Sequence, residues 1–281
     1  MLLAPCSLLL EPEPKMPDFR LDKKRILLTG AAGRFGRAIL SALLDAGAEP
    51  ILVGRNEQRL REAIEDAALP DNDRCHVLAC DIGDESARTN LVNELHERFD
   101  SLHGIVNNAY SGRVGNLESI LPEDFNDATA MNLVAPFELV KQCLGLLEAS
   151  AMKTGHAASV VNVASMYGLV SPDPSVYGDS GKNNPVHYGA TKAGMIQMSR
   201  YLGCHLAQRG VRVNSVSPGP FPDLSVDPGI PGFYDNLAAK VPMGRVGQPH
   251  EVAGPVIFLL SEAASYVNGA DLRIDGGWTA W

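Results

Sequence analysis

The sequence has few cysteines and no cysteine motif. Its 281 residues include five cysteines, an odd number, and no two of them form a C-x-x-C pair. A small secreted protein stapled by disulfides uses an even set of cysteines, so this pattern argues against a disulfide framework. We therefore expect free thiols in a reducing compartment and a cytoplasmic protein.

The sequence also lacks an excess of positive charge and any histidine motif with the spacing of metal ligands. The 24 lysines and arginines are outnumbered by 33 aspartates and glutamates, so the formal net charge is −9. A protein that grips the phosphates of nucleic acid needs a basic surface, and we expect no nucleic-acid partner. The seven histidines include no H-E-x-x-H motif, so we expect no catalytic metal.

Long apolar runs are absent as well. The first ten residues, MLLAPCSLLL, are apolar, but a membrane span needs about 20 such residues and a signal peptide begins with basic ones. We expect no membrane association. We interpret residues 1–24 as a disordered extension; the alternative is that the start is misassigned and Met16 is the natural one.

From Arg25 onward, short apolar runs alternate with segments of helical length. Continuous runs rich in Val and Ile are typical of strands buried on both faces of a parallel sheet. The repeated strand–helix–strand pattern predicts a doubly wound, Rossmann-type α/β fold: a seven-stranded parallel sheet in a single domain, residues 25–281. We expect strands at 25–29, 50–54, 75–81, 102–109, 159–165, 211–217 and 271–275. We expect helices at 34–46, 56–68, 86–98, 123–151, 188–209 and 250–262.

A glycine-rich turn follows the first expected strand and opens a helix. The run T-G-A-A-G-R-F-G places its glycines at Gly30, Gly33 and Gly36. Glycines let the backbone approach a pyrophosphate, and a helix N-terminus supplies free N–H groups and a positive dipole. We therefore predict a dinucleotide site here, with a plain glycine-rich turn as the alternative.

The end of the second expected strand bears on the choice between NAD and NADP. An acidic residue at this point binds the ribose of NAD, whereas a basic one accommodates the 2′-phosphate of NADP. The chain has Gly54-Arg55-Asn56 there and no carboxylate. We expect Arg55 to face a 2′-phosphate, with Arg34 as a second candidate, so NADP is favoured over NAD. A solvated surface arginine is the alternative for Arg55.

Across residues 25–281 the chain resembles the short-chain dehydrogenase/reductase family, because its motifs occur in that family's order. After the glycine-rich turn, the motifs are Asp81-Ile82, Asn107-Asn108-Ala109, Asn132, Ser165, Tyr188-x-x-x-Lys192, Pro218-Gly219-Pro220, Asn268-Gly269 and Asp275-Gly276-Gly277. The resemblance implies an NAD(P)-dependent oxidoreductase that interconverts an alcohol and a carbonyl by hydride transfer.

The same resemblance implies that Asn132, Ser165, Tyr188 and Lys192 are catalytic. Hydride transfer to a carbonyl leaves an alkoxide that needs a proton, and a tyrosine with a pKa of about 10 exchanges one near neutrality only beside a cation. Tyr188 and Lys192 are four residues apart and share one helical face. By the resemblance, Lys192 also holds the nicotinamide ribose, Ser165 binds the substrate oxygen and Asn132 anchors a water.

Further cofactor contacts are implied by the resemblance. Asp81 and Ile82 match positions beside the adenine, and Phe221 matches one near the nicotinamide carboxamide. The cofactor-binding set that we expect is Gly30, Gly33, Arg34, Phe35, Gly36, Arg55, Asp81, Ile82, Asn108, Ala109, Tyr188, Lys192, Pro218, Gly219 and Phe221.

Three features depart from the family pattern and bear on the substrate. Arg34 stands where the single-domain branch usually has glycine, and Tyr110 replaces the glycine usual after Asn-Asn-Ala. The interval between Ser165 and Tyr188 is longer than usual. We expect the long, Pro- and Gly-rich stretch before Tyr188, with its many polar groups, to be a surface loop that helps to form the substrate pocket.

We expect a small, polar substrate: a sugar, a polyol or a sugar nucleotide. A looser resemblance is to oxidoreductases of nonulosonic acid pathways. A sugar-nucleotide epimerase or dehydratase is one alternative, and a catalytically silent NAD(P)-binding regulator is another. The complete Asn-Ser-Tyr-Lys set argues against the regulator. The family's usual dimer face, on the Tyr188 helix and the helix before the fifth strand, implies a homo-oligomer, either a tetramer or a dimer.

Overall fold

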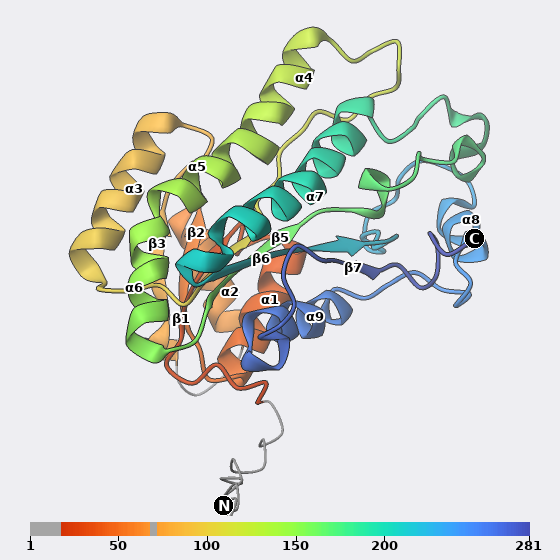
Figure 1. The fold of residues 1–281 in the computed structure, drawn as a ribbon. Helices are drawn as coiled ribbons and strands as arrows, with labels where there is room; N and C mark the ends of the chain where they lie inside the picture. Colours follow the sequence, from red (N-terminus) through yellow and green to blue (C-terminus); the bar gives the residue numbers. More distant parts are fainter. Residues whose placement is uncertain (1–17, 68–71) are drawn as a thin grey trace, which may run out of the picture.

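The computed structural model describes residues 18–67 and 72–281. Seven parallel strands form one sheet in the order β3-β2-β1-β4-β5-β6-β7 (Figure 1). This confirms the single α/β domain that the apolar runs predict. The strands are β1 (Arg25–Thr29), β2 (Glu49–Gly54), β3 (His76–Ala79), β4 (Gly104–Asn107), β5 (Ala158–Val163), β6 (Val211–Pro218) and β7 (Asp271–Ile274).

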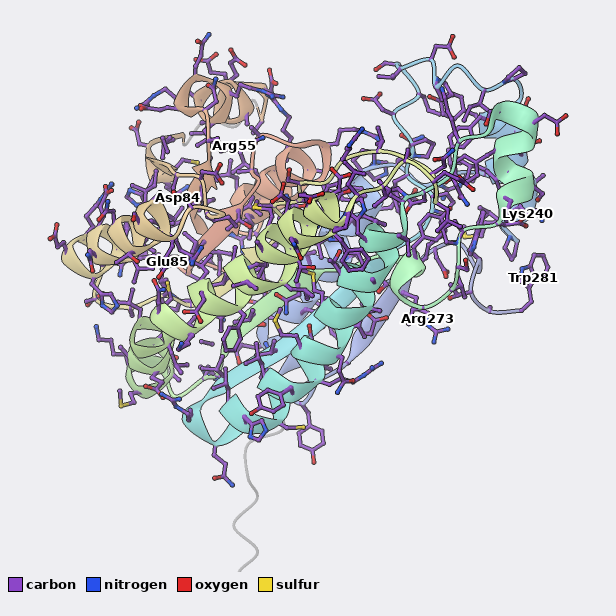
Figure 2. All side chains as sticks on the ribbon, turned by 90° about the horizontal axis from the view of Figure 1, so that it is seen from above. Arg55, Asp84, Glu85, Lys240, Arg273 and Trp281 are labelled. Carbon is purple, nitrogen blue, oxygen red and sulfur yellow. The ribbon has the colours of Figure 1, made fainter. Side chains whose placement is uncertain are left out.

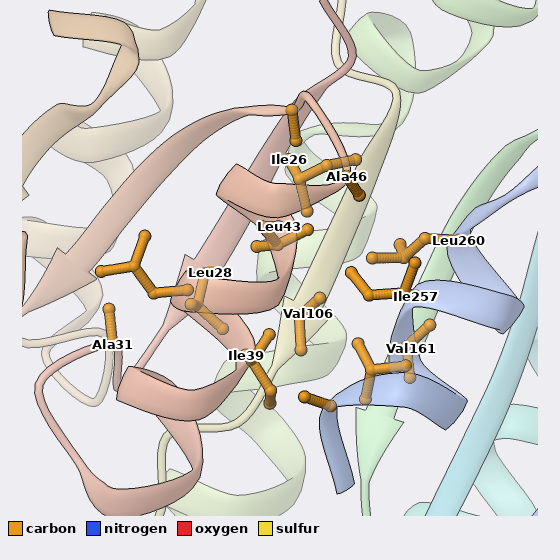
Figure 3. Packing of buried hydrophobic residues seen from close by; sticks show 14 of the residues in the cluster. Ile26, Leu28, Ala31, Ile39, Leu43, Ala46, Val106, Val161, Ile257 and Leu260 are labelled. Carbon is orange, nitrogen blue, oxygen red and sulfur yellow. The ribbon is translucent and has the colours of Figure 1, made fainter. Parts of the chain in front are cut away.

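Helices cover both faces of the sheet (Figure 1). The helices are α1 (Arg34–Asp45), α2 (Glu57–Asp66), α3 (Glu85–Arg98), α4 (Pro122–Thr129), α5 (Ala135–Gln142), α6 (Leu144–Thr154), α7 (Val186–Leu206), α8 (Phe233–Lys240) and α9 (His250–Leu260). Side chains alternate along each strand, so one strand serves two apolar layers. Ile26 and Leu28 of β1 pack with α1, α2 and α9, and Leu27 between them packs with α3, α5, α6 and α7. Figure 3 shows the first of these layers.

The strand order reverses at β1, and this positions the site. Ile26 of β1 pairs with Pro50 of β2 on one side and with Gly104 of β4 on the other. The chain leaves β1 and β4 toward opposite faces of the sheet, so their carboxyl ends diverge. Ligands of doubly wound sheets bind in the crevice that opens at such a point.

The expected helix over 123–151 is wrong as a single element. A π-helical turn, Ala130–Val134, joins α4 to α5. At Cys143 the helix is interrupted, and this residue separates α5 from α6. A π-turn adds a residue to the helical ladder and often occurs at functional sites. Here it carries Asn132, which is fully buried. The apolar pattern runs through both breaks, and this is why the sequence indicated one helix.

The stretch before Tyr188, which we expect to be a surface loop, contains an ordered element, and so does the long segment after β6. A 3-10 turn, Pro174–Ser180, lies before Tyr188, and α8 follows β6. Val176 of that turn is fully buried against Leu237 of α8, in a cluster that also holds Met166 and Trp278. The expected surface loop is therefore anchored to the body, because its few apolar residues meet partners far away in the sequence.

Residues 18–24 are part of the fold, so the expected disordered extension of 1–24 is too long. Leu21 is fully buried, and its backbone N–H donates to the carbonyl of Ala46 at 2.7 Å. The Lys24 ammonium forms an ion pair with Glu262 at 2.7 Å. Residues 1–17, with Met16, lie outside the described residues, and the expectation for them stays untested.

In the described part of the chain, no single helix is long and apolar enough to cross a membrane. One bent pair, Pro122–Gln142 with Leu144–Thr154, reaches that length and composition jointly. Leu139 and Leu147 of this pair lie in the apolar layer that also contains Leu27 of β1.

Candidate active site

A cleft of about 680 Å³ opens where the strand order reverses. Its volume is that of a typical small-molecule site, roughly 300–1,000 Å³. The segments after the first four strands, together with Met131 and Phe221, form its walls. The lining residues are Thr29, Gly30, Ala32, Gly33, Arg34, Phe35, Val53, Gly54, Arg55, Asn56, Arg59, Cys80, Asp81, Ile82, Gly83, Asn108, Ala109, Tyr110, Ser111, Met131 and Phe221.

The glycine-rich turn forms one wall and needs its glycines. Gly30 has a φ of +66°, and a Cβ there would come within 2.8 Å of Cα of Ala109. A Cβ on Gly36 would collide with the carbonyl oxygen of Gly30. The first turn of α1 carries no acidic side chain, and no side chain caps its N–H groups. This backbone cradle fits the pyrophosphate of a dinucleotide.

Two arginines lie at the β2 end of the cleft. Arg55 follows β2 (Figure 2), and Arg59 lies in the first turn of α2. The Asn56 side chain accepts a hydrogen bond from the Arg59 N–H at 3.0 Å and so fixes the start of α2. The sequence-based cofactor set lacks Arg59, although a basic residue in the first turn of the helix after β2, close to Arg55 in the sequence, could have indicated it.

A hydrogen-bond network joins the segment after β4, which forms another wall of the cleft, to the glycine-rich turn. The Asn108 amide donates to the carbonyls of Thr29 and Gly30, at 3.1 and 3.0 Å. The Thr29 hydroxyl accepts from the N–H groups of Asn108 and Ala109. Asn108 therefore positions the turn after β1 in addition to lining the cleft.

Tyr188 and Lys192 lie in the first two turns of α7, and Ser165 follows β5. Burial raises the pKa of Tyr188, and a hydrogen bond with Ser165 acts in the opposite direction. Burial lowers the pKa of Lys192 to about 8. At neutral pH the phenol is protonated and the ammonium is charged, which is the pairing that proton donation to a carbonyl requires.

The Lys192 ammonium is anchored beside the phenol. It donates to the carbonyl of Val163 at 2.6 Å and lies 5.8 Å from the ring centroid of Tyr188. The turn Met166–Gly168, which follows Ser165, packs closely on the same helix, because a Cβ on Gly168 would come within 2.8 Å of the Lys192 backbone. The structure thus brings the predicted Ser165, Tyr188 and Lys192 together.

Asn132 is linked to the site by hydrogen bonds to Ser111, in the segment after β4. Its side-chain amide donates to the carbonyl of Ser111 at 3.0 Å, and its oxygen accepts from the Ser111 N–H at 3.2 Å. Ser111 itself lines the cleft. Asn132 therefore holds the cleft wall next to Tyr110.

Two further residues are notable here: Tyr110, which lies beside Tyr188 and Lys192, and His187, which precedes Tyr188 in α7. The ring of Tyr110 contacts that of Tyr188, and the Lys192 ammonium lies 5.6 Å from the Tyr110 centroid. His187 is fully buried, and neither ring nitrogen has a hydrogen-bond partner among the described residues. Sequence analysis noted Tyr110 only as a departure from the pattern, and no sequence signal indicated His187.

The predicted cofactor set divides into two groups. Ten of its members line the cleft: Gly30, Gly33, Arg34, Phe35, Arg55, Asp81, Ile82, Asn108, Ala109 and Phe221. The lining does not include Gly36, Pro218, Gly219, Tyr188 or Lys192. In the described ranges, no group of three His, Cys, Asp or Glu side chains is placed to hold a metal ion. Contact of each predicted residue with a cofactor stays a prediction.

Comparison with known proteins identifies the family. A family model described as enoyl-(acyl carrier protein) reductase matches residues 30–279. The chain belongs to the short-chain dehydrogenase/reductase family. It is accordingly an NAD(P)-dependent oxidoreductase that acts on CH–OH groups of a small-molecule substrate.

Two relatives and one solved structure cover nearly the whole of this short-chain dehydrogenase/reductase. D-threitol dehydrogenase of Mycolicibacterium smegmatis is 34% identical over 93% of this chain and 95% of that protein. NADH-dependent L-xylulose reductase of Ambrosiozyma monospora is 31% identical over 95% and 98%, respectively. The Pseudomonas aeruginosa RhlG/NADP complex superposes with a TM-score of 0.82 at 29% identity, over 93% of this chain and 98% of that one.

Proposed function

We propose that the enzyme interconverts an alcohol and a carbonyl on a sugar or polyol, with Tyr188 as the acid/base. The observation that carries the proposal is the buried pairing of Tyr188 with Lys192, next to Ser165. Tyr110 separates this pair from the cleft, whose size suits a dinucleotide. A neutral phenol and a serine hydroxyl together supply the hydrogen bonds that a carbonyl oxygen needs as it gains negative charge.

In the reductive direction, a bound nicotinamide supplies the hydride. The Tyr188 phenol gives its proton to the substrate oxygen, and the Ser165 hydroxyl donates a hydrogen bond to that oxygen. The Lys192 ammonium stabilises the phenolate left behind, since an adjacent cation favours the charged form. In the oxidative direction, the Tyr188 phenolate takes the proton from the substrate hydroxyl.

Relatives and local chemistry support a hydroxylated substrate. Several relatives are named for polyols or sugars: D-threitol, L-xylulose and D-arabinitol. Polar bridges connect the three segments beyond β4, β5 and β6: Asn116 donates to the Gly181 carbonyl at 3.1 Å, and Lys182 to the Pro228 carbonyl at 2.7 Å. These segments offer many amide and hydroxyl groups to substrate hydroxyls.

For the cofactor, we propose that NADP is preferred. Arg55 and Arg59 line the cleft at the N-terminus of α2, where the helix dipole also favours an anion. The acidic residue that binds the NAD ribose is lacking after β2. Relatives are named with either dinucleotide, so these local residues carry the proposal.

We propose a homo-oligomer, either a tetramer or a dimer, in the cytoplasm. Val186 and Tyr201 of α7 and Val134 of the π-turn are apolar residues that are about half exposed or more. Other apolar side chains of α5 and α7, such as Leu139 and Leu202, pack against the chain's own sheet. Light scattering at micromolar concentration tests the assembly, and a monomer would contradict it. Cysteines 75, 80, 143 and 204 are free thiols, which suits a reducing compartment.

A substrate screen tests the activity. D-threitol, L-xylulose and D-arabinitol are offered with NADP and NAD, next to 3-oxoacyl thioesters, because some relatives are 3-oxoacyl-[acyl-carrier-protein] reductases. We expect turnover of at least one polyol or sugar, and none by Tyr188→Phe. Turnover of acyl thioesters alone would overturn the substrate class and leave the reaction intact.

A further inference from the structure

Arg34 connects two walls of the cleft that are far apart in the sequence. It is the first residue of α1, and its guanidinium Nη1 donates to the carbonyl of Phe221 at 2.8 Å. Arg34 belongs to the turn after β1, whereas Phe221 belongs to the segment after β6. Both residues line the cleft, so the arginine side chain spans it.

Both ends of this bridge are held in place. The Phe221 ring packs edge-on against Phe35 at a centroid distance of 5.3 Å, and it lies so close to Gly247 that a Cβ there would collide with it. The Gly247 N–H donates to the carbonyl of Pro220 at 2.9 Å, which fixes the same segment. Arg34 itself starts a regular helix. The guanidinium therefore has a defined position at the mouth of the backbone cradle.

The bridge leaves most of the arginine's donors and its charge available. A guanidinium has five N–H donors, and the Phe221 carbonyl uses one of them. No carboxylate in residues 18–67 and 72–281 forms an ion pair with Arg34 at 4.0 Å or closer, although Asp223 lies within electrostatic range. A cation with spare donors beside an uncapped helix N-terminus is suited to bind an anion.

The direction of the side chain indicates which anion. In the sheet order, β2 and β6 lie on opposite sides of β1. Arg34 reaches toward the β6 side, away from Arg55 and the 2′-phosphate position at the β2 end. The anion that lies between these two ends of a dinucleotide, at the glycine-rich turn, is the pyrophosphate.

We propose that Arg34 closes over the pyrophosphate and donates simultaneously to a phosphate oxygen and to the Phe221 carbonyl. The inference rests on the proposed dinucleotide binding and assigns Arg34 a role other than 2′-phosphate contact. Because NAD and NADP share the pyrophosphate, Arg34 contributes equally to the affinity for both. Arg55, at the β2 end, contributes to NADP alone.

Direct binding titrations of NADPH and NADH, followed by nicotinamide fluorescence, test the assignment. Arg34→Met should weaken both by the same factor, about tenfold, as expected for a lost charge-assisted hydrogen bond. Arg55→Met should weaken NADPH alone. The control is Arg61→Met, which removes the same charge from an exposed arginine that pairs with Glu57 outside the cleft lining; it should change neither affinity.

Two results would overturn the assignment. A loss confined to NADPH in Arg34→Met would make Arg34 a 2′-phosphate contact, and unchanged affinity for both dinucleotides would show that the bridge binds no phosphate. Arg34 is exposed, so we expect its variants to fold, and an unchanged thermal midpoint verifies this. Failure of the wild-type enzyme to bind either dinucleotide would instead contradict the proposed function.

Discussion

The ring of Tyr110 meets the ring of Tyr188 edge-on, with centroids 5.1 Å apart and planes at 90°. The face of Tyr110 also lies 5.6 Å from the Lys192 ammonium. Tyr110, at a position where glycine is usual in the family, therefore lies between the cleft and the pair formed by Tyr188 and Lys192. We propose that Tyr110 is a positioning residue that limits how much water reaches Tyr188 and Lys192.

We predict that Tyr110→Gly shifts the pH profile of alcohol oxidation to lower pH. Oxidation needs the Tyr188 phenolate, and burial raises the pKa of that phenol. Water admitted by the glycine favours the phenolate and lowers this pKa. The same water raises the pKa of Lys192 from about 8, so its cation persists to higher pH and acts in the same direction.

The measurement is the pH dependence of kcat/KM, and Tyr110→Phe is the matched control. Phenylalanine keeps the ring over the pair, so the ascending limb of the profile, where the Tyr188 phenol ionises, should stay at its wild-type position. An ascending limb of Tyr110→Gly that coincides with that of the wild type would show that Tyr110 does not shield the pair.

Cofactor choice provides a second prediction. Arg55→Asp places a carboxylate at the end of β2, where it can bind ribose hydroxyls and repels a 2′-phosphate. We expect kcat/KM for NADP to fall and the preference to move toward NAD. A wild-type enzyme that already favours NAD tenfold, which is about 1.4 kcal/mol of transition-state binding, would refute the NADP proposal.

The turn before Tyr188 is expected to shape the substrate site. Replacing residues 178–184 with a short Gly-Ser link removes the contact of Lys182 with the Pro228 carbonyl but keeps the Val176 anchor. We predict a higher KM for the identified substrate with unchanged dinucleotide affinity. If kcat and KM both keep their wild-type values, this segment is a bystander.

Truncation of Val176 tests how much the packing of this segment contributes to the stability of the protein. Val176 is fully buried in one apolar cluster with Leu237 and Trp278, so Val176→Ala leaves a small cavity. We expect the free energy of unfolding to fall by about 1–2 kcal/mol in denaturant titration, by comparison with other truncations of buried aliphatic side chains. The exposed Val226→Ala is the control and should cost much less. Equal effects of the two variants would show that the turn is not anchored.

Much of the fold could be predicted because the strands are buried on both faces. Continuous runs such as RILLT have no other stable place in a domain of this size, so β1 was located at its observed bounds. The π-turn at Asn132 could not be predicted, because apolar residues continue on both sides of it and no local signal marks the extra residue. The 3-10 turn at Val176 depends on an apolar partner in α8, about 60 residues away in the sequence.

Ser165, Tyr188 and Lys192 could be predicted because the resemblance to the family identifies them by motifs in a fixed order. The fold brings these three residues together. To predict the role of Arg59, one would have to know where α2 begins. To predict the hydrogen bond from Arg34 to Phe221, one would have to know how the segments after β1 and β6 are arranged in three dimensions. Such contacts across the sheet leave no local trace in the sequence.

The most direct test of the central claim compares the wild-type enzyme with Tyr188→Phe on the substrate that the screen identifies. Steady-state kcat and dinucleotide affinity are measured on the same preparations. We predict a fall in kcat on the order of 10³-fold, as for loss of an acid/base group, with dinucleotide affinity retained within about twofold. Near-normal kcat in Tyr188→Phe would contradict the assignment of Tyr188 as the acid/base.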